Sequence, residues 1–586
     1  MPRTPAPAAR LLAATLRPER RSVTRILAVL VAAMALRLSM PVLLGVFVDD
    51  AVNGRSLDRL TQVAGLYIGA ALAAEGLQLA VVWSSVKLSW RAGNRLREQL
   101  ADHALRLDLG WHGRHSPGQL IERIDGDVEA LCVFFANVVL EVLGNAILVV
   151  GMLAVAFAID VRAGLVLLAV VVLGTTLLVR QRAAAVPARE AEREANAQLY
   201  GDLEERLGGL EDLRANGAGT YAVHRLHGHS ARAWRTARYA SLRGDGAYAI
   251  SAIAFAAGSV SILALGFVLH RSDVVTVGAV VSLFRFSEMM RHPLERIAEQ
   301  MKEFQKAFAG ARRAATMLAT ESSIPDGAGV ALPSGPLTVE LDAVTFSYRP
   351  GTPVLRGIDL VLEPGRHVGV IGRTGSGKTT LGRLLLRFWD VDDGVVRVGG
   401  VDVREVPVQA LRRRIAVVTQ DVELFDASLR DNLTLFGTHV AADERLVAVL
   451  GDVGLAPWLA TLPDGLDTHL AGSGSLSAGE GQLLAFARAF LADPDVVVLD
   501  EASSRLDPVT EARIGAATHA LLAGRSALII AHRLATLDEV DEIVVIDDGE
   551  IVERGPRAVL AADPSTRYSR LLRISTGGLL ADEVVV

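Results

Sequence analysis

Cysteine, lysine and aromatic residues are all scarce in this sequence. Its 586 residues include one cysteine and four lysines, and only 5% are aromatic. A single cysteine cannot form a disulfide within the chain and excludes a metal site made of cysteine pairs. Cys132 lies in an apolar segment, so we interpret it as a small core residue. The net charge of -6 is small for this length, and nucleic acid is therefore not an expected partner.

Apolar residues, by contrast, are abundant. Hydrophobic residues make up 51% of the chain and the mean hydropathy is +0.34, which is more apolar than a water-soluble globular protein should be. Six runs before residue 300 are long enough to cross a bilayer, which takes about 20 residues. They are Ile26–Phe47, Val63–Trp83, Val133–Ile159, Ala163–Val179, Ala247–Leu269 and Val274–Met290. We therefore predict an all-α transmembrane domain of six helices in a lipid bilayer.

An arginine-rich segment precedes the first apolar run. It contains six arginines and one acidic residue, Glu19. The positive-inside rule then places the N-terminus in the cytoplasm. A cleavable signal peptide is the alternative, although the apolar run is too long for one. With this orientation, the short connections between runs lie outside. Two long charged connections, around Arg91–Val128 and Arg180–Gly246, lie inside and predict helices that extend into the cytoplasm.

Glycine and proline interrupt each long inner connection once, at residues 111–127 and 208–226. These interruptions predict short helices that lie across the tips of the long ones and contact another domain. Ordinary helix-turn-helix connections are the alternative.

Four ionisable residues fall within the predicted spans: Arg37, Glu75, Glu141 and Arg285. Charges at this depth are costly and usually face a partner or a water-filled path. Arg37 and Glu75 have similar depths on adjacent spans, which indicates an ion pair. For Arg285 the hypothesis is that it lines a cavity and contacts substrate.

A phosphate-binding loop is the strongest feature of the second half. Residues 372–380 read GRTGSGKTT, between the apolar strand HVGVI and the helical LGRLLLRFW, which is the context this loop requires. The backbone around Gly375 and Gly377 is expected to wrap the phosphates of ATP. Lys378 is expected to neutralise the β and γ oxygens, and Thr379 to bind Mg²⁺. The remaining positions assigned to ATP binding are Gly372, Thr374, Ser376 and Thr380.

Two carboxylates and a histidine complete the expected chemistry. The apolar strand in DPDVVVLDEASSRLD ends in Asp500 and Glu501. Asp500 is suited to the Mg²⁺ shell, and Glu501 to taking a proton from the attacking water. The strand SALIIA leads to His532, where an imidazole could hydrogen-bond the γ-phosphate and orient that water.

The order of these motifs is informative as a set. The phosphate loop is followed by VVTQDVELF, LSAGEGQ, VVVLDE, SRLD and AHR. This series resembles the ATP-binding cassette (ABC) transporters, and the six preceding spans resemble their exporter-type half-transporters. The resemblance implies that Tyr348 stacks on adenine and that Gln420 joins Mg²⁺ to the membrane domain. It also implies that Asp507 lies in a loop between two ATP sites, and that residues 111–127 and 208–226 are coupling helices.

The resemblance also predicts the division of the chain. A cytoplasmic segment (1–20) precedes the transmembrane domain (21–318). A turn-rich linker (319–336) then leads to an α/β nucleotide-binding domain (337–578) and a tail (579–586).

The motif LSAGE departs from the family pattern LSGGQ. In the family, the serine and the second glycine of this motif close over the ATP held by a partner domain. We call this pair the cup; in this chain it consists of Ser477 and Gly479. Ala478 adds a methyl group and Glu480 a carboxylate, so both are expected to weaken the contact with ATP. A chain with complete hydrolytic residues and an imperfect cup resembles one half of a heterodimer, whereas a homodimer with a tolerant cup is the alternative.

The predicted function is ATP-driven export of an amphipathic small molecule, lipid or peptide, by alternating access in a dimer of half-transporters. An importer on the same fold, similar to some siderophore systems, is one alternative. An ATP-gated regulator or channel is another, but Glu501 and His532 disfavour it because a pure switch gains nothing from efficient turnover. The predicted location is the inner or plasma membrane of a bacterium, with multiple spans and both termini in the cytoplasm.

Overall fold

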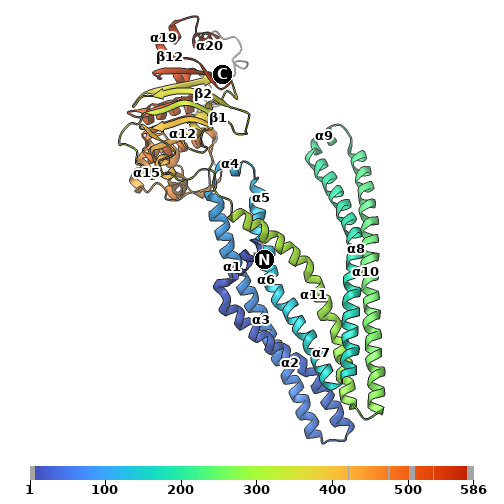
Figure 1. Cartoon of the computed structure of the whole chain (residues 1–586). Coiled ribbons are helices and arrows are strands. Elements are labelled where there is room, and N and C mark those ends of the chain that lie inside the picture. Colours follow the sequence, from blue (N-terminus) through green and yellow to red (C-terminus); the bar gives the residue numbers. More distant parts are fainter. Residues whose placement is uncertain (1–6, 420–421, 473–475, 501–507, 532–533, 577–586) are drawn as a thin grey trace. The chain divides into compact units, whose positions relative to one another are not determined.

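A computed structural model describes residues 7–419, 422–472, 476–500, 508–531 and 534–576. The chain divides into two compact units (Figure 1). Unit 1 consists of Met1–Leu105 and Pro117–Thr320, and unit 2 of Arg106–Ser116 and Glu321–Val586. A short piece of the first inner connection thus belongs to the same unit as the C-terminal half.

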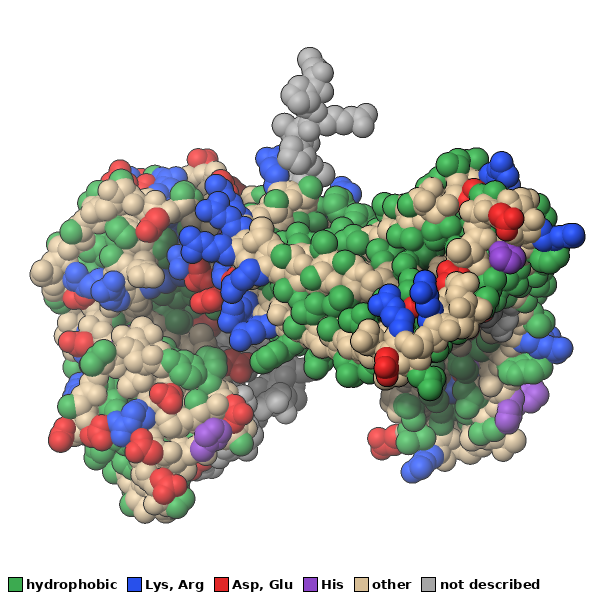
Figure 2. Space-filling model, turned by 90° about the horizontal axis from the view of Figure 1, so that it is seen from below, with side chains coloured by type: hydrophobic (Ala, Val, Ile, Leu, Met, Phe, Trp, Pro, Cys, Tyr) green, Lys and Arg blue, Asp and Glu red, His purple; other side chains and the backbone are tan. Residues whose placement is uncertain are grey.

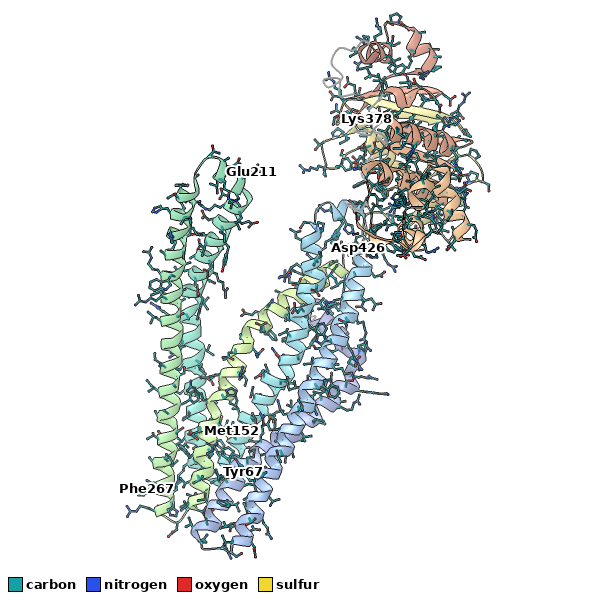
Figure 3. All side chains as sticks on the ribbon, turned by 180° about the vertical axis from the view of Figure 1, so that it is seen from behind. Tyr67, Met152, Glu211, Phe267, Lys378 and Asp426 are labelled. Carbon is teal, nitrogen blue, oxygen red and sulfur yellow. The ribbon has the colours of Figure 1, made fainter. Side chains whose placement is uncertain are left out.

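Unit 1 is built from long helices. The short α1 (Pro7–Leu16) and the 3₁₀ turn η1 (Arg17–Glu19) come first. The long helices are α2 (Arg20–Val52), α3 (Leu57–Arg106), α8 (Val161–Gly208), α10 (Gly219–Arg271) and α11 (Val277–Leu318). Between α3 and α8 the chain forms α5 (Pro117–Ile121), the π-helical turn η2 (Glu122–Gly126), α6 (Asp127–Asn137), the π-helical turn η3 (Val138–Gly144) and α7 (Asn145–Ile159). The helix α9 (Leu210–Ala215) joins α8 to α10, which run side by side in Figures 1 and 3.

Five helical segments among the described residues are long and apolar enough to cross a membrane: Ala8–Val52, Leu57–Arg106, Pro117–Ile159, Val161–Gly208 and Gly219–Arg271. At most 28% of the most apolar window of each is buried within the chain, so most of their apolar surface is available to lipid. Figure 2 shows hydrophobic side chains gathered over this helical part. The sixth predicted span falls in α11, where Arg285 and Glu288 interrupt the apolar pattern.

The short connections follow the predicted pattern. Helices α2 and α3 are separated by residues 53–56, α7 and α8 by Asp160 alone, and α10 and α11 by residues 272–276. Near the start of α11, the Asp49 carboxylate accepts hydrogen bonds from Gly278 N (2.7 Å) and Thr276 Oγ1 (2.6 Å). A carboxylate at a helix N-terminus satisfies free backbone donors and complements the helix dipole. Asp49 therefore fixes α11 against α2.

Unit 2 begins with α4 (Leu109–His112) and continues as an α/β domain. A four-stranded sheet has the order β2-β1-β4-β5. Its strands are β1 (Val339–Phe346), β2 (Leu355–Leu362), β4 (Asp393–Val398) and β5 (Val401–Asp402). A two-stranded sheet pairs β7 (Asp426–Ser428) with β8 (His469–Ala471).

The central sheet of unit 2 has six strands in the order β12-β11-β3-β10-β9-β6. They are β3 (His367–Gly372), β6 (Ile415–Val418), β9 (Val496–Asp500), β10 (Ser526–Ile530), β11 (Glu542–Asp547) and β12 (Glu550–Pro556). All neighbours pair in parallel except β11 and β12. Residues 496–499 of β9 and all of β10 are buried, as expected for parallel strands covered on both faces.

Besides α4, unit 2 contains the helices that follow α11. They are α12 (Lys378–Leu385), α13 (Val408–Arg414), α14 (Leu429–Thr434), α15 (Asp443–Asp452), α16 (Ala456–Leu459), α17 (Ala478–Ala492), α18 (Pro508–Leu522), α19 (Arg557–Ala562) and α20 (Arg567–Thr576), with the 3₁₀ turns η4 (Gly465–Asp467) and η6 (Leu534–Leu537). The fold class predicted from the sequence, a helical membrane domain followed by an α/β domain, is confirmed.

Candidate functional site

The phosphate-binding loop lies where β3 ends and α12 begins. Gly377 is the residue before α12 and has a φ of +103°, a region that disfavours side chains. A Cβ at Gly377 would also lie 2.5 Å from Leu355 Cδ2, so glycine is required there for packing as well. Gly375 has a φ of +86° and nothing within 4 Å of the position a Cβ would take. The loop therefore leaves open space on the side of Gly375.

Lys378 begins α12 and is buried, with 5% of its surface exposed (Figure 3). Its ammonium group donates hydrogen bonds to Gly372 O and to Arg373 O, the latter at 3.2 Å. The loop's own carbonyl groups thus hold a positive charge at a helix N-terminus, where backbone N–H groups also attract anions.

One polar atom in this loop lacks a partner. Ser376 Oγ is buried and has no hydrogen-bond partner among the described residues. A buried hydroxyl without a partner costs about 1–3 kcal/mol, which an incoming acceptor would recover. This hydroxyl, the open space at Gly375 and the charge of Lys378 fit the phosphates of ATP.

The strand register brings Asp500 to the same edge of the sheet. Asp500 ends β9 and pairs with Ile530 of β10, which in turn pairs with Val370 of β3. Carboxyl ends of parallel strands share one edge, so Asp500 lies two strands from the start of the phosphate loop. Thr379, the second residue of α12, is half-buried in the same region of the fold.

Tyr348 lies beside the loop in a polar and aromatic cluster. Its hydroxyl is 3.2 Å from Thr380 Oγ1 and accepts a hydrogen bond from Arg383 Nη1 at 3.2 Å. Its ring meets Trp389 edge-on, with centroids 5.1 Å apart. Tyr348 as a whole is 41% exposed, which leaves surface for a flat ligand to stack on. Arg383 and Trp389 could not be predicted from the sequence as part of this site, because only their position beside Tyr348 indicates a role.

The cup sequence forms the start of α17. Ser477 Oγ donates to Glu480 Oε2 (2.8 Å) and accepts from Glu480 N (3.3 Å), while Ser477 N donates to the same carboxylate (2.9 Å). This is a capping box, in which serine and glutamate satisfy each other's backbone groups. The spacing Ser-x-x-Glu is present in the sequence and is typical of a capping box. The Ser477 hydroxyl therefore donates its hydrogen within the capping box.

Gly479 has a packing role in this chain. A Cβ there would lie 2.3 Å from Thr510 Cγ2 of α18, so glycine lets the two helices approach. Ala478, in contrast, is exposed at the first position of α17. Of the cup residues, Ser477 and Ala478 are accessible and Gly479 is buried.

The short helix α4 packs within unit 2, which also contains the phosphate-binding loop. A Cβ at Gly110 would lie 3.2 Å from Trp389 Nε1, so this glycine allows close approach to the residue that also contacts Tyr348. Asp108 caps α4 by accepting from Trp111 N (2.7 Å) and accepts from Ser323 N (2.7 Å). Of the first interrupted segment, residues 111–116 thus belong to unit 2, whereas residues 117–127 belong to unit 1.

The ionised carboxylate of Asp108 joins α4 to Ser323. Burial opposes its ionisation, but hydrogen bonds from the N–H groups of Ser323 and Trp111 outweigh this and hold the pKa of the carboxyl below its ordinary value of 3.8. A lowered pKa means that the contact stabilises the fold fully above pH 3.8, and that its contribution is lost as the pH falls through the lowered value. At neutral pH the Asp108 carboxylate is therefore ionised and keeps its hydrogen bonds to Ser323 and Trp111.

The four ionisable residues predicted within the spans all have partners. Arg37 Nη2 lies 2.9 Å from Glu75 Oε1, so the predicted ion pair is confirmed. Glu141 Oε2 accepts from Asn145 Nδ2 at 3.1 Å, within the π-helical turn η3. Arg285 Nη1 lies 2.8 Å from Glu288 Oε2 on the same helix. That Arg285 contacts substrate stays a prediction.

Four residues assigned to the ATP site from the sequence lie outside the described residues. They are Gln420, Glu501, Asp507 and His532. Their assignments remain predictions.

Comparison with known proteins agrees with this architecture. Residues 23–294 match the family described as "ABC transporter transmembrane region", and residues 355–504 match "ABC transporter". The chain is 31% identical over 534 residues to a "Fatty acid ABC transporter ATP-binding/permease protein" of Mycobacterium bovis, covering 90% of this chain and 83% of the relative. It is 30% identical over 490 residues to an "ATP-dependent lipid A-core flippase" of Escherichia coli, covering 80% and 82% respectively.

A third relative is longer. A "Multidrug efflux ATP-binding/permease protein" of Mycobacterium bovis is 34% identical over 510 residues, which is 84% of this chain and 42% of the relative. The chain belongs to the ABC transporters, and it is an exporter-type half-transporter that binds ATP and couples its hydrolysis to transport.

Proposed function

We propose that this half-transporter exports an amphipathic small molecule, lipid or peptide from the cytoplasm of a bacterium. The observation that carries the proposal is a phosphate loop ready for ATP, with Ser376 Oγ unpartnered, in a chain whose other half exposes apolar helices to lipid. The relatives' names, which mention fatty acids, lipid A-core and multidrug efflux, support an amphipathic cargo. Both termini are proposed to lie in the cytoplasm, because ATP is there.

In the proposed reaction each residue of the ATP site has one task. Lys378 and the loop N–H groups neutralise and orient the phosphates. Thr379, Asp500 and Gln420 would hold Mg²⁺, which supplies positive charge to the phosphate oxygens. Glu501 takes a proton from the attacking water, and His532 orients that water by hydrogen bonding. Tyr348 holds the adenine by stacking.

Export requires two ATPase domains, and the described surfaces support a dimer. The segment around α9 exposes apolar side chains at the end of unit 1 where Glu211 is labelled in Figure 3: Leu207, Leu210, Tyr221 and Val223. We propose that this surface docks onto the partner's ATPase domain, while α4 docks onto its own. Movement of two ATPase domains would then switch the spans between inward-open and outward-open states, with Asp507 in a loop between the two ATP sites.

The capping box favours a heterodimer. The carboxylate of Glu480 accepts from both donor groups of Ser477 and lies at a helix N-terminus, the place that a γ-phosphate would occupy. A phosphate brought there meets a like charge and an engaged hydroxyl. This chain's cup, formed by Ser477 and Gly479, would therefore cover an ATP site at which hydrolysis is slow. Its own phosphate loop would need a different chain with an intact cup.

Inverted membrane vesicles from a host that produces the native complex test the proposal. We expect a fluorescent fatty acid or an amphipathic dye to accumulate inside them when ATP is added outside, and not in the same vesicles without ATP. Accumulation only in right-side-out vesicles loaded with ATP would indicate the importer. ATP hydrolysis that moves no probe, across a panel of amphipathic compounds, would favour the regulator or channel.

A further inference from the structure

A cavity of about 450 Å³ lies between α2 and α3. Its floor is apolar and well packed, because Ile26, Val81 and Leu88 are each at most 5% exposed. Two hydroxyl groups, on Ser22 and Ser84, also line it. A cavity with an apolar floor and polar groups at its edge suits a ligand that has both characters.

Three cations surround this cavity: Arg25 from α2, and Lys87 and Arg91 from α3. No acidic residue lines it, and no ion pair to any of the three is found among the described residues. The neighbouring acid Glu19 is engaged by Arg95, with Nη2 and Oε1 3.3 Å apart, and its Oε2 accepts a hydrogen bond from Ser22 Oγ at 3.2 Å. Like charges held together repel one another, so the cavity favours an anion.

The cations lie at the boundary between the apolar and the charged parts of both helices. Arg25 precedes the apolar run that begins at Ile26, and Lys87 follows the run that ends at Trp83 by four residues. This boundary is the level of lipid headgroups. On α3, Leu79 and Trp83 are 70% and 71% exposed and offer an apolar surface next to the cavity.

We propose that this cavity binds the headgroup phosphate of an anionic phospholipid. Basic pockets between membrane helices on the cytoplasmic side recognise such headgroups. Arg25, Lys87 and Arg91 neutralise the phosphate, the Ser84 hydroxyl donates to its oxygens, and the acyl chains lie along the apolar surface of α3. The assignment to the cytoplasmic leaflet rests on the orientation proposed above, whereas the binding itself does not.

Lipid binding to the purified full-length protein tests this site. We expect Lys87→Gln/Arg91→Gln to weaken binding of phosphatidylglycerol, titrated by native mass spectrometry, by about fivefold for each charge removed. The matched control is Arg180→Gln/Arg238→Gln, which removes two exposed charges from α8 and α10 outside the cavity and should leave this binding unchanged. Lys87→Arg should also retain it.

Three outcomes would overturn the proposal. One is equal loss of phosphatidylglycerol binding in the cavity variant and in the control. Another is binding of phosphatidylcholine as tight as that of phosphatidylglycerol. The third is full competition by glycerol phosphate at the lipid's own concentration, which would indicate a site for a soluble anion. Thermal unfolding of both double variants checks that they are folded. Because the readout is binding, failure here leaves the vesicle test of export unaffected.

Discussion

The Glu501→Gln variant is expected to hydrolyse ATP at least about a hundredfold more slowly than the unchanged complex. A positioned general base contributes roughly this factor or more, and glutamine cannot accept the proton of the attacking water. Because binding is left intact, the variant should retain ATP and hold the two ATPase domains closed. Phosphate release and retention of labelled nucleotide measure the two effects.

Glu444→Gln is the matched control for this prediction. Glu444 is an exposed residue in the first turn of α15, so the same chemical change there should leave the hydrolysis rate unaltered. Turnover in Glu501→Gln close to that of the control would remove Glu501 from the mechanism and reopen the alternative of an ATP-gated switch.

Lys378→Ala is expected to weaken ATP binding by at least about tenfold and to abolish measurable hydrolysis. The ammonium group is the only part of the side chain that brings positive charge to the phosphates, and charge-assisted hydrogen bonds are worth about 1.5–3 kcal/mol each. Titration with a fluorescent ATP analogue measures the affinity, and phosphate release measures the rate.

The folded state of the Lys378→Ala variant needs a separate check, because the ammonium group also holds Gly372 O and Arg373 O in the loop. Thermal unfolding without nucleotide provides it. Lys306→Ala, which changes an exposed lysine of α11, is the control and should bind ATP normally. Normal ATP affinity in a folded Lys378→Ala protein would contradict the assignment of this loop.

Short sequence patterns predicted the buried strands and the phosphate-binding loop, because neighbouring residues determine these elements. The run VVVLD forms β9 because a continuous apolar segment suits a strand buried on both faces, and GRTGSGKTT joins β3 to α12 as its glycines require. The sixth predicted span, Val274–Met290, is not among the five apolar segments found in the described residues. The charges of Arg285 and Glu288 interrupt its apolar run, and they are compensated by each other, a partnership that hydropathy does not register.

Tertiary contacts could not be predicted in the same way. The approach of Gly110 to Trp389 joins residues almost three hundred positions apart, and nothing near either residue indicates it. The role of Gly479 is similar, because the methyl group that requires a glycine there belongs to Thr510 on another helix. The capping box of Ser477 and Glu480 is a different case, since its spacing was present in the sequence and was overlooked.

We propose that Glu480 keeps phosphate out of this chain's own cup, so that its catalytic site needs the cup of a different chain. The mass of the native complex tests this most directly: the chain is tagged in its own host, purified in mild detergent and weighed as an assembly. We expect the complex to contain this chain and one different half-transporter that carries an intact LSGGQ. An active complex made of two identical copies of this chain would contradict it.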